Sequence, residues 1–295
     1  MNGKLFDDFC AFGQAHLECQ DVDPAYPVLR HLLRNEGLAG RIESCHHYVA
    51  WYNIASSLEA WSGGLRAHSV DPALIHHWKL ALLPTGVERR GLRGGANLMD
   101  HLANQNVVLN GMPWDKWTAQ AATWDQMGQL IQTIKGNGRW AAYKLCELMQ
   151  KVAGLDITPT DMGHEFSSGP RKGLALLYDD CPEHKDQRKT SIARLNELSD
   201  DLMNRCVLWC PDIALLETLL CDFHSLWKGH FYVGHDTDEM LAGINKLTDG
   251  PVKNRLLEAR AAPLPSDYLG EHSGWTGVCK DRIRAYIDQG EIWVR

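Results

Sequence analysis

Residues 134–144 read Ile-Lys-Gly-Asn-Gly-Arg-Trp-Ala-Ala-Tyr-Lys, a turn with two glycines followed by a partly apolar stretch. In a Gly-x-Gly turn the backbone bends without side-chain hindrance, and its amides stay accessible. After the turn, apolar residues recur at helical spacing, at Ala141, Leu145, Leu148, Met149 and Val152. The stretch therefore predicts a tight turn followed by a helix that buries one face.

The composition of this turn is typical of a phosphate-binding hairpin. A helix that begins directly after glycines presents its amide-rich end to an anion. Because basic side chains flank the glycines, we predict a helix-hairpin-helix whose DNA-binding residues are Lys135, Gly136, Asn137, Gly138, Arg139 and Lys144. An ordinary helical connection closed by a glycine cap remains the alternative.

The rest of the chain also has helical patterns. Leu5, Phe9 and Phe12 share one helical face near the N-terminus, and Ile192 and Leu195 mark a half-exposed helix later in the chain. No segment reads as a strand, so we expect an all-α fold. The 295 residues, 44% of them hydrophobic, suffice for a large core in one extended domain or in two lobes that share a cleft.

The segment from about residue 42 to residue 61 is the most aromatic part of the chain, and it contains Trp51, Tyr52 and Asn53. Aromatic residues at helical spacing are core more often than ligand platform. A base stacked on an aromatic ring nevertheless needs a nearby amide to read its edge, and these residues offer both groups. They are therefore candidates for a base-binding pocket.

The charge of the chain limits how it can bind nucleic acid. A net charge of −7 argues against a nonspecific coat on DNA, because phosphate binding needs local cations. Basic residues are concentrated at 88–95, 135–144, 171–172 and 185–194. Any one of these segments alone is more often a solvated face than a phosphate site.

Cysteine content and hydropathy indicate a cytoplasmic protein. The nine cysteines fit free thiols in a reducing compartment, and the spacing of Cys206, Cys210 and Cys221 matches no zinc or iron–sulfur site. No apolar run approaches the length of a membrane span, and Asp7 and Asp8 interrupt the N-terminal apolar residues, unlike a secretion signal. We expect no metal, no cofactor and no membrane partner.

Arg89, Arg90 and Arg93 lie in a loop punctuated by glycines. Three guanidinium forks on a flexible backbone can surround an oxyanion. The loop is therefore a candidate phosphate or carboxylate site. The alternative is that these arginines pair with acidic neighbours at the surface.

A later block, from Cys221 to Asp236, alternates polar groups with aromatic residues. Cys221 and His224 are three apart, a spacing that fits a metal site or a nucleophile–base pair, but no second pair completes a metal site. His224 is a candidate proton acceptor, because imidazole is matched to neutral pH.

Three segments together resemble one family: the hairpin region at 134–177, the arginine loop at 88–95 and the block at 221–236. They are similar to the phage enzymes of thymine hypermodification, a branch of the helix-hairpin-helix DNA glycosylase fold. That branch includes the amino acid:DNA transferases and the α-glutamyl/putrescinyl-thymine pyrophosphorylases. The resemblance implies a glycosylase-like helical domain over residues 1–295, with the hairpin at about 134–153, N- and C-terminal helices packing together, and two helical lobes around a DNA-binding cleft.

The resemblance also implies the chemistry. An amine of an amino acid or a polyamine attacks a phosphate-activated 5-hydroxymethyluracil in double-stranded DNA, and phosphate or pyrophosphate departs. The modified base is flipped from the stack onto Trp51 or Tyr52, and Arg89, Arg90 and Arg93 neutralise the leaving group. By analogy with the glycosylases, Asp161 lies at the start of the helix after the hairpin, and either it or His224 accepts the proton of the amine. We expect a monomer in the cytoplasm, which is the host cytoplasm if a phage encodes it.

Two absences refine the prediction. The chain has no Gly-x-x-x-x-Gly-Lys-Ser/Thr loop to hold a nucleoside triphosphate, which separates it from the related kinases. Trp140 stands where bifunctional glycosylases of this fold carry a Schiff-base lysine, although Lys144 follows one turn later. A monofunctional glycosylase that uses Asp161 and a noncatalytic DNA-binding module remain the alternatives.

Overall fold

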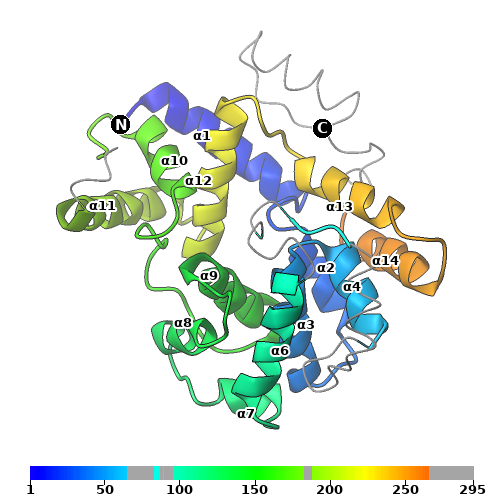
Figure 1. The fold of residues 1–295 in the computed structure, drawn as a ribbon. Helices are drawn as coiled ribbons and strands as arrows, with labels where there is room; N and C mark the ends of the chain where they lie inside the picture. The colour runs from blue at the N-terminus through cyan, green and yellow to red at the C-terminus, as the bar shows by residue number, and fades with distance from the viewer. Residues whose placement is uncertain (65–82, 87–88, 90–95, 183–187, 266–295) are drawn as a thin grey trace. The chain divides into compact units, whose positions relative to one another are not determined.

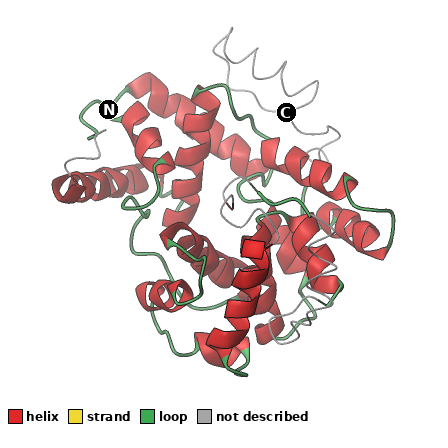
Figure 2. Ribbon diagram, viewed as in Figure 1, coloured by secondary structure: helices red, strands yellow, loops and turns green. Residues whose placement is uncertain are grey.

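The computed structural model of the protein describes residues 1–64, 83–86, 89, 96–182 and 188–265. Within these ranges the regular elements are all helices, and no strand is present (Figure 2). The predicted all-α class is confirmed. None of the described helices combines the length and the apolar character needed to cross a membrane.

The chain divides into two compact units, each built from segments that are distant in sequence. Unit 1 contains residues 1–24 and 159–242, together with the described residues from Leu264 onward. Unit 2 contains residues 25–158 and 243–263. The N-terminal helix therefore shares a unit with helices that follow it by more than 140 residues.

Unit 1 is organised around α12 (Ile213–Trp227), which packs against α1 (Gly3–Glu18) and α10 (Gly169–Leu177) (Figure 1). Asp212 begins α12, because its carboxylate accepts from the amides of Ala214 and Leu215 at 2.9 and 3.1 Å. The unit also contains α11 (Arg188–Cys206) and the beginning of α13 (His235–Asn245).

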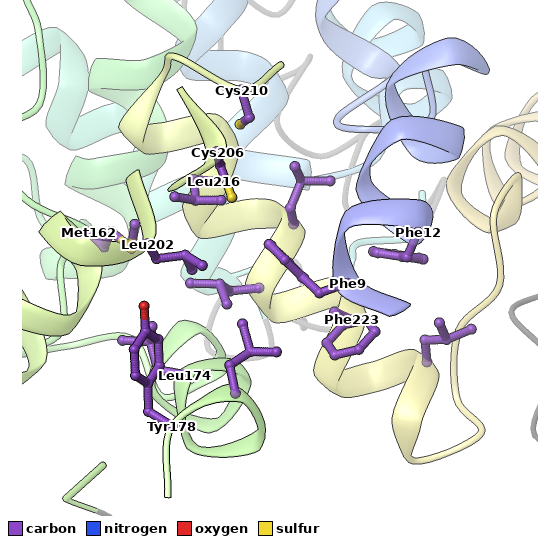
Figure 3. Close-up of a cluster of buried hydrophobic side chains, with 14 of the residues drawn as sticks. Phe9, Phe12, Met162, Leu174, Tyr178, Leu202, Cys206, Cys210, Leu216 and Phe223 are labelled. Atoms are coloured by element: carbon purple, nitrogen blue, oxygen red, sulfur yellow. The ribbon is translucent and has the colours of Figure 1, made fainter. Parts of the chain in front are cut away.

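The core of unit 1 is mainly aliphatic and aromatic (Figure 3). The ring of Phe9 meets that of Phe223 edge to face at 5.3 Å, and Phe12 lies 5.7 Å from the same ring. Leu202 and Leu216 are 0% exposed in this cluster. Burial of each such side chain stabilises the fold by about 1.5–3 kcal/mol. The apolar residues that recur at helical spacing in α1 therefore pack against α12.

Two glycines of α10 allow a close contact with α12. A Cβ atom at Gly173 would collide with the carbonyl group of Leu220, and one at Gly169 would collide with the thiol of Cys221. Because Leu220 contributes backbone atoms in the middle of α12, it cannot move aside as a side chain can. The closeness of α10 and α12 therefore depends on the missing side chains.

Gly173→Ala is expected to destabilise the protein by about 1–3 kcal/mol, the range seen when a packed interface is overfilled. The matched control is Gly128→Ala, a helical position where no atom lies within 4 Å of the added Cβ. That control should be neutral or more stable, since alanine favours helix over glycine by about 1 kcal/mol. Urea denaturation of both variants measures the difference, and equal stabilities would contradict the close contact.

Unit 2 contains the central hairpin and the helices around it. In chain order these are α2 (Ala25–Leu32), α3 (Leu38–Trp51), α4 (Ile54–Ser62), α6 (Ala96–Leu109), α7 (Trp114–Thr118), α8 (Trp124–Gln132), α9 (Arg139–Leu148), the π-helical turn η3 (Met149–Ala153) and α14 (Pro251–Ala261). Helix α3 contacts α4, α7, α9 and η3, so it forms the centre of the unit. Trp51, Leu98 and Leu102 belong to its buried core.

Two predicted elements are wrong in detail. The aromatic segment at 42–61 is broken at Tyr52, which adopts the left-handed conformation with φ of 47°, and Asn53 then caps α4 by accepting from Ser56 N at 3.0 Å. Asp161 does not lie at the start of a helix, since the next helix, α10, begins at Gly169. Instead Asp161 Oδ1 accepts from Gly163 N at 2.6 Å, which closes a local turn.

Candidate nucleic-acid interface and catalytic residues

The predicted hairpin consists of α8, a turn over residues 133–138 and α9 (Figure 1). Ile131 and Ile134 are 0% exposed and anchor the turn in the core of unit 2. Gly136 has φ of +92°, a conformation that side chains disfavour, and Gly138 is the N-cap of α9 with extended backbone. The two glycines therefore serve different purposes: the first reverses the chain and the second begins a helix.

The outer face of the turn is exposed and carries positive charge. The side chain of Lys135 is 72% exposed, and Gly136, Gly138 and Arg139 are also exposed. No atom lies within 4 Å of a Cβ built on Gly138, so the approach to the first turn of α9 is open. The first amides of a helix have no acceptor within it, and its dipole is positive at this end. This face has the chemistry that binds an anion.

Helix α6 holds the turn from behind through three polar side chains one turn apart. Asn104 Oδ1 accepts from Lys135 N at 2.6 Å, and His101 Nδ1 donates to Lys135 O at 2.6 Å. Gln105 Nε2 lies 3.1 Å from His101 Nε2 and donates to it. Burial lowers the pKa of His101 to about 4, so the ring stays neutral at neutral pH with its proton on Nδ1. The Lys135 peptide is thereby fixed at both its N–H and its C=O.

Arg89 braces the next part of the turn. It is 5% exposed, with Nη1 donating to Gly136 O at 3.2 Å and Nη2 to Asn137 Oδ1 at 3.4 Å. The buried Asn137 amide in turn donates to Ile131 O at 3.4 Å. Burial lowers the pKa of Arg89 to about 10, so it is still a cation at neutral pH. Arg89 and Asn137 therefore lie behind the turn, while Arg90 and Arg93 lie outside the described residues.

Replacing Arg89 is expected to affect the turn more than the chemistry. Arg89→Ala removes both bonds to the turn and should lower stability by about 2 kcal/mol, with a parallel loss of DNA affinity. Arg89→Lys should recover little, because an ammonium lacks the two-pronged fork. Urea denaturation, DNA binding and turnover at saturating DNA are measured together. If turnover fell strongly while stability and DNA affinity held, Arg89 would contact the leaving group instead.

Of the three predicted base-pocket residues, only Tyr52 lies near the hairpin in a half-exposed setting. Its ring meets that of Trp140 at 5.0 Å and 75°, so the two form an aromatic corner at the first turn of α9. Trp51 is 2% exposed and lies parallel to His47 at 5.9 Å, a core position. Asn53 uses its side-chain oxygen to cap α4.

Lys144 does not face solvent. Its ammonium lies 2.9 Å from Glu147 Oε2, with side-chain exposures of 10% and 1%, and the hydroxyl of Tyr26 donates to the same oxygen at 2.9 Å. A cation held this way cannot reach a phosphate without breaking a buried ion pair. We therefore leave Lys144 out of the proposed DNA interface and assign it to the core of unit 2.

The two proton-acceptor candidates both lie in unit 1. Asp161 is exposed and closes the turn described above. His224 is half-buried on α12, and burial, Lys172, Lys228 and His230 all lower its pKa below the ordinary value of 6.5. The imidazole is therefore neutral at neutral pH, and the charges of Lys172 and Lys228 contribute to lowering its pKa. A neutral imidazole can accept a proton, and lysine charges can stabilise a phosphate.

Sequence reasoning missed the polar groups that support the turn. His101, Asn104 and Gln105 share one face of α6 at i, i+3 and i+4, a pattern visible in the sequence. Trp140 was noted only as the replacement of a lysine, and Lys172 only as part of a basic pair. Their partners, Tyr52 and His224, are distant in sequence.

The fold and these residues define an all-helical protein with a braced hairpin turn flanked by cations. Residues 101–232 match the family described as amino acid:DNA transferase (ADDT). The match covers somewhat less than half of the chain and includes most of α6, the hairpin, α10, α11 and α12. The match supports the resemblance to this family that the sequence shows. No curated protein matches the chain.

Proposed function

We propose that the protein transfers an amino acid, through its amine, onto phosphate-activated 5-hydroxymethyluracil in double-stranded DNA. The match of residues 101–232 to the amino acid:DNA transferase family supports transfer between these two substrates. The family description names neither the activated base nor the leaving phosphate, and both are part of our proposal. The observation that carries the proposal is that the matched segment contains the hairpin turn, which α6 holds in place, and also His224.

The hairpin supplies the DNA contact in this proposal. Because the turn is fixed from behind by α6 and Arg89, its outer amides are held in place before DNA arrives. Preorganised donors lose less entropy on binding. Lys135 and Arg139 add charge at the same face, which an acidic chain needs locally. We infer that this element is a helix-hairpin-helix that grips the DNA backbone.

Tyr52 and Trp140 are the aromatic groups best placed to help extrude a base. Both are half-exposed and lie at the N-terminal end of α9, beside the proposed backbone contact. Extrusion costs a few kcal/mol of stacking, and a flat aromatic surface recovers part of that cost. We assign these two residues to the flipped base or to the gap it leaves, in place of the core residue Trp51.

The chemical step needs a neutral amine and a stabilised leaving group. As the carbon–oxygen bond to phosphate breaks, the oxygen keeps the electron pair, and the amine nitrogen forms a new bond to the exocyclic carbon. The new ammonium then loses a proton, which His224 can accept because its lowered pKa leaves the imidazole unprotonated at neutral pH. Lys172 and Lys228 carry the charge that balances the departing phosphate. Atoms and charge balance without a further co-reactant.

The experiment offers the protein two kinds of DNA. One duplex contains 5-phosphomethyluracil and is incubated with a pool of amino acids. The other contains uracil or an alkylated base. Mass spectrometry of the digested nucleosides should show a new amino acid adduct with intact glycosidic bonds, only from the first duplex and only with amino acids present.

Two other outcomes would overturn the proposal. Free base released without an adduct would identify a monofunctional glycosylase. Binding of both duplexes without any product would identify a noncatalytic DNA-binding module. Omitting amino acids from the first duplex controls for spontaneous hydrolysis of the activated base.

Gly138→Asp tests the hairpin contact directly. The position is open, so the change should fold normally, while its carboxylate stands where a phosphate would bind. DNA affinity should fall by about 10- to 100-fold at low salt, the scale of a lost charge-assisted contact. The control is Gly128→Asp, which adds the same charge at another open position of the hairpin, on α8. Equal affinities for the two variants would remove the turn from the DNA interface.

A further inference from the structure

The C-terminal end of α1 gathers three side chains with metal-binding atoms. Asp21 N donates to His16 O at 3.2 Å, and Gln20, with φ of 54°, donates to Leu17 O at 3.0 Å. This pair of bonds is the Schellman motif, which folds the residues after a helix back over its last turn. As a result His16, Cys19 and Asp21 converge, with one ligand atom of each within 4.8 Å of the others.

His16 lies between two carboxylates and has one ring nitrogen without a hydrogen bond. Its Nε2 is 3.2 Å from Asp222 Oδ2, and its Nδ1 is 3.7 Å from Asp21 Oδ2. The side chains of His16 and Asp21 are both 0% exposed, and Nδ1 has no hydrogen-bond partner. A buried polar atom without a hydrogen bond is unfavourable, so a ligand at Nδ1 would stabilise this arrangement.

Neither neutral form of the ring satisfies both sides. With the proton on Nε2, the bond to Asp222 is made and the lone pair of Nδ1 faces the carboxylate of Asp21. With the proton on Nδ1, the closer pair, Nε2 and Asp222, becomes a contact between lone pairs. A positive charge between Nδ1 and Asp21 resolves the conflict. The sulfur of Cys19 lies within 4.8 Å of the ligand atoms of His16 and Asp21. Its presence indicates a metal ion as the source of this positive charge.

We propose that His16 Nδ1, Asp21 Oδ2 and Cys19 Sγ bind a zinc ion, with Asp222 orienting His16. Imidazole nitrogen, thiolate sulfur and carboxylate oxygen are the three donor types that zinc takes in proteins. The thiolate and the carboxylate of Asp21 balance the two positive charges of the ion, which permits a fully buried site. The Nε2 contact with Asp222 is the outer hydrogen bond that zinc-binding histidines usually make.

The ion would link α1 to the beginning of α13. Asp21 already accepts from Gly234 N at 2.8 Å and from Thr237 N at 2.7 Å, so its carboxylate caps that helix. Its Oδ2 atom also accepts from Asp236 N, but at 3.4 Å, and an ion on the side of His16 would replace this longer contact. A ligand there would hold the carboxylate against both elements. The site thus stabilises unit 1, independently of the proposed transfer reaction.

The first test uses the wild-type chain purified without a metal-affinity tag. Elemental analysis should find about one zinc per chain after growth in zinc-supplemented medium. Stripping with a chelator should lower the melting temperature, and added Zn²⁺ should restore it. Co²⁺ in place of zinc should give the near-ultraviolet absorption of a cobalt–thiolate bond, which reports cysteine as a ligand without any mutation.

Variants then identify the ligands. Cys19→Ala should abolish stoichiometric zinc, whereas Cys210→Ala, also a fully buried cysteine of unit 1, should keep it. Asp222→Asn should weaken zinc binding by about 10- to 100-fold, as loss of an orienting carboxylate does. If the wild type binds no zinc on titration and its melting temperature does not change, the charge beside His16 is a proton and the site is withdrawn. Zinc that survives in Cys19→Ala would also overturn it.

Discussion

Replacing Lys144 with alanine is expected to destabilise the protein by about 3–5 kcal/mol, because it removes the ammonium from a buried ion pair. Glu147 is 1% exposed and lies 2.9 Å from the ammonium of Lys144. The hydroxyl of Tyr26 contributes one hydrogen bond to the same oxygen but no charge. A loss of this size is a large part of the 5–15 kcal/mol that is typical of a folded domain.

Two comparisons make this result specific to the buried pair. Lys253→Ala removes a lysine from an ion pair whose aspartate, Asp249, is 93% exposed, and its stability should hardly change. The double variant Lys144→Met with Glu147→Gln buries no unpaired charge and keeps an acceptor for Tyr26, so it should recover much of the loss. Urea denaturation measures all three. A Lys144→Ala protein as stable as Lys253→Ala would show that Lys144 is solvated, and would return it to the set of possible DNA contacts.

Replacing His224 with alanine should lower turnover in the transfer reaction by about 100- to 10,000-fold, the range for loss of a general base. DNA affinity should change little, because the proposed backbone contact is made by the hairpin. His31→Ala, which removes a half-buried histidine from α2 in unit 2, is the control and should turn over normally. Single-turnover assays on the phosphorylated duplex separate the chemical step from product release.

The pH dependence distinguishes a base from a merely structural histidine. Burial, and then the charges of Lys172, Lys228 and His230, lower the pKa of His224 below 6.5, so activity should rise with pH and level off before neutrality. Lys172→Met removes one of these charges, which raises the pKa and should move the rise to higher pH. A profile that is the same in wild type and Lys172→Met would assign the proton to another group, with Asp161 the next candidate.

The sequence predicted the helices better than their ends. Helical spacing and the Gly-x-Gly turn were sufficient for α8, the turn and α9, because these are local patterns. The break at Tyr52 was missed, since Asn53 is a capping residue inside a run that otherwise continues. Helix α10 was also missed as an element, because its place depends on the contact between Gly173 and the backbone of Leu220.

The roles of charged residues were harder to predict than the helices. Arg89 and Lys144 looked alike as cations near a phosphate-binding turn, yet the structure buries both, one against the back of the turn and one against Glu147. In the sequence, a basic residue that is buried in an ion pair looks the same as one that is exposed to a ligand. Its function depends on which acceptor lies within about 3 Å, and that distance is a tertiary property.

The sequence by itself determined that the chain is helical, that a glycine turn separates α8 from α9, and that the chain resembles the amino acid:DNA transferases. These depend on periodicity, on glycine and on motifs that are local in the chain. Only the tertiary structure decided that Arg89 and His101 brace the turn, that Tyr52 meets Trp140, and that His16 lies between Asp21 and Asp222. Those contacts join residues as much as 206 positions apart, and burial of the apolar faces, which no local pattern contains, is what brings such residues together.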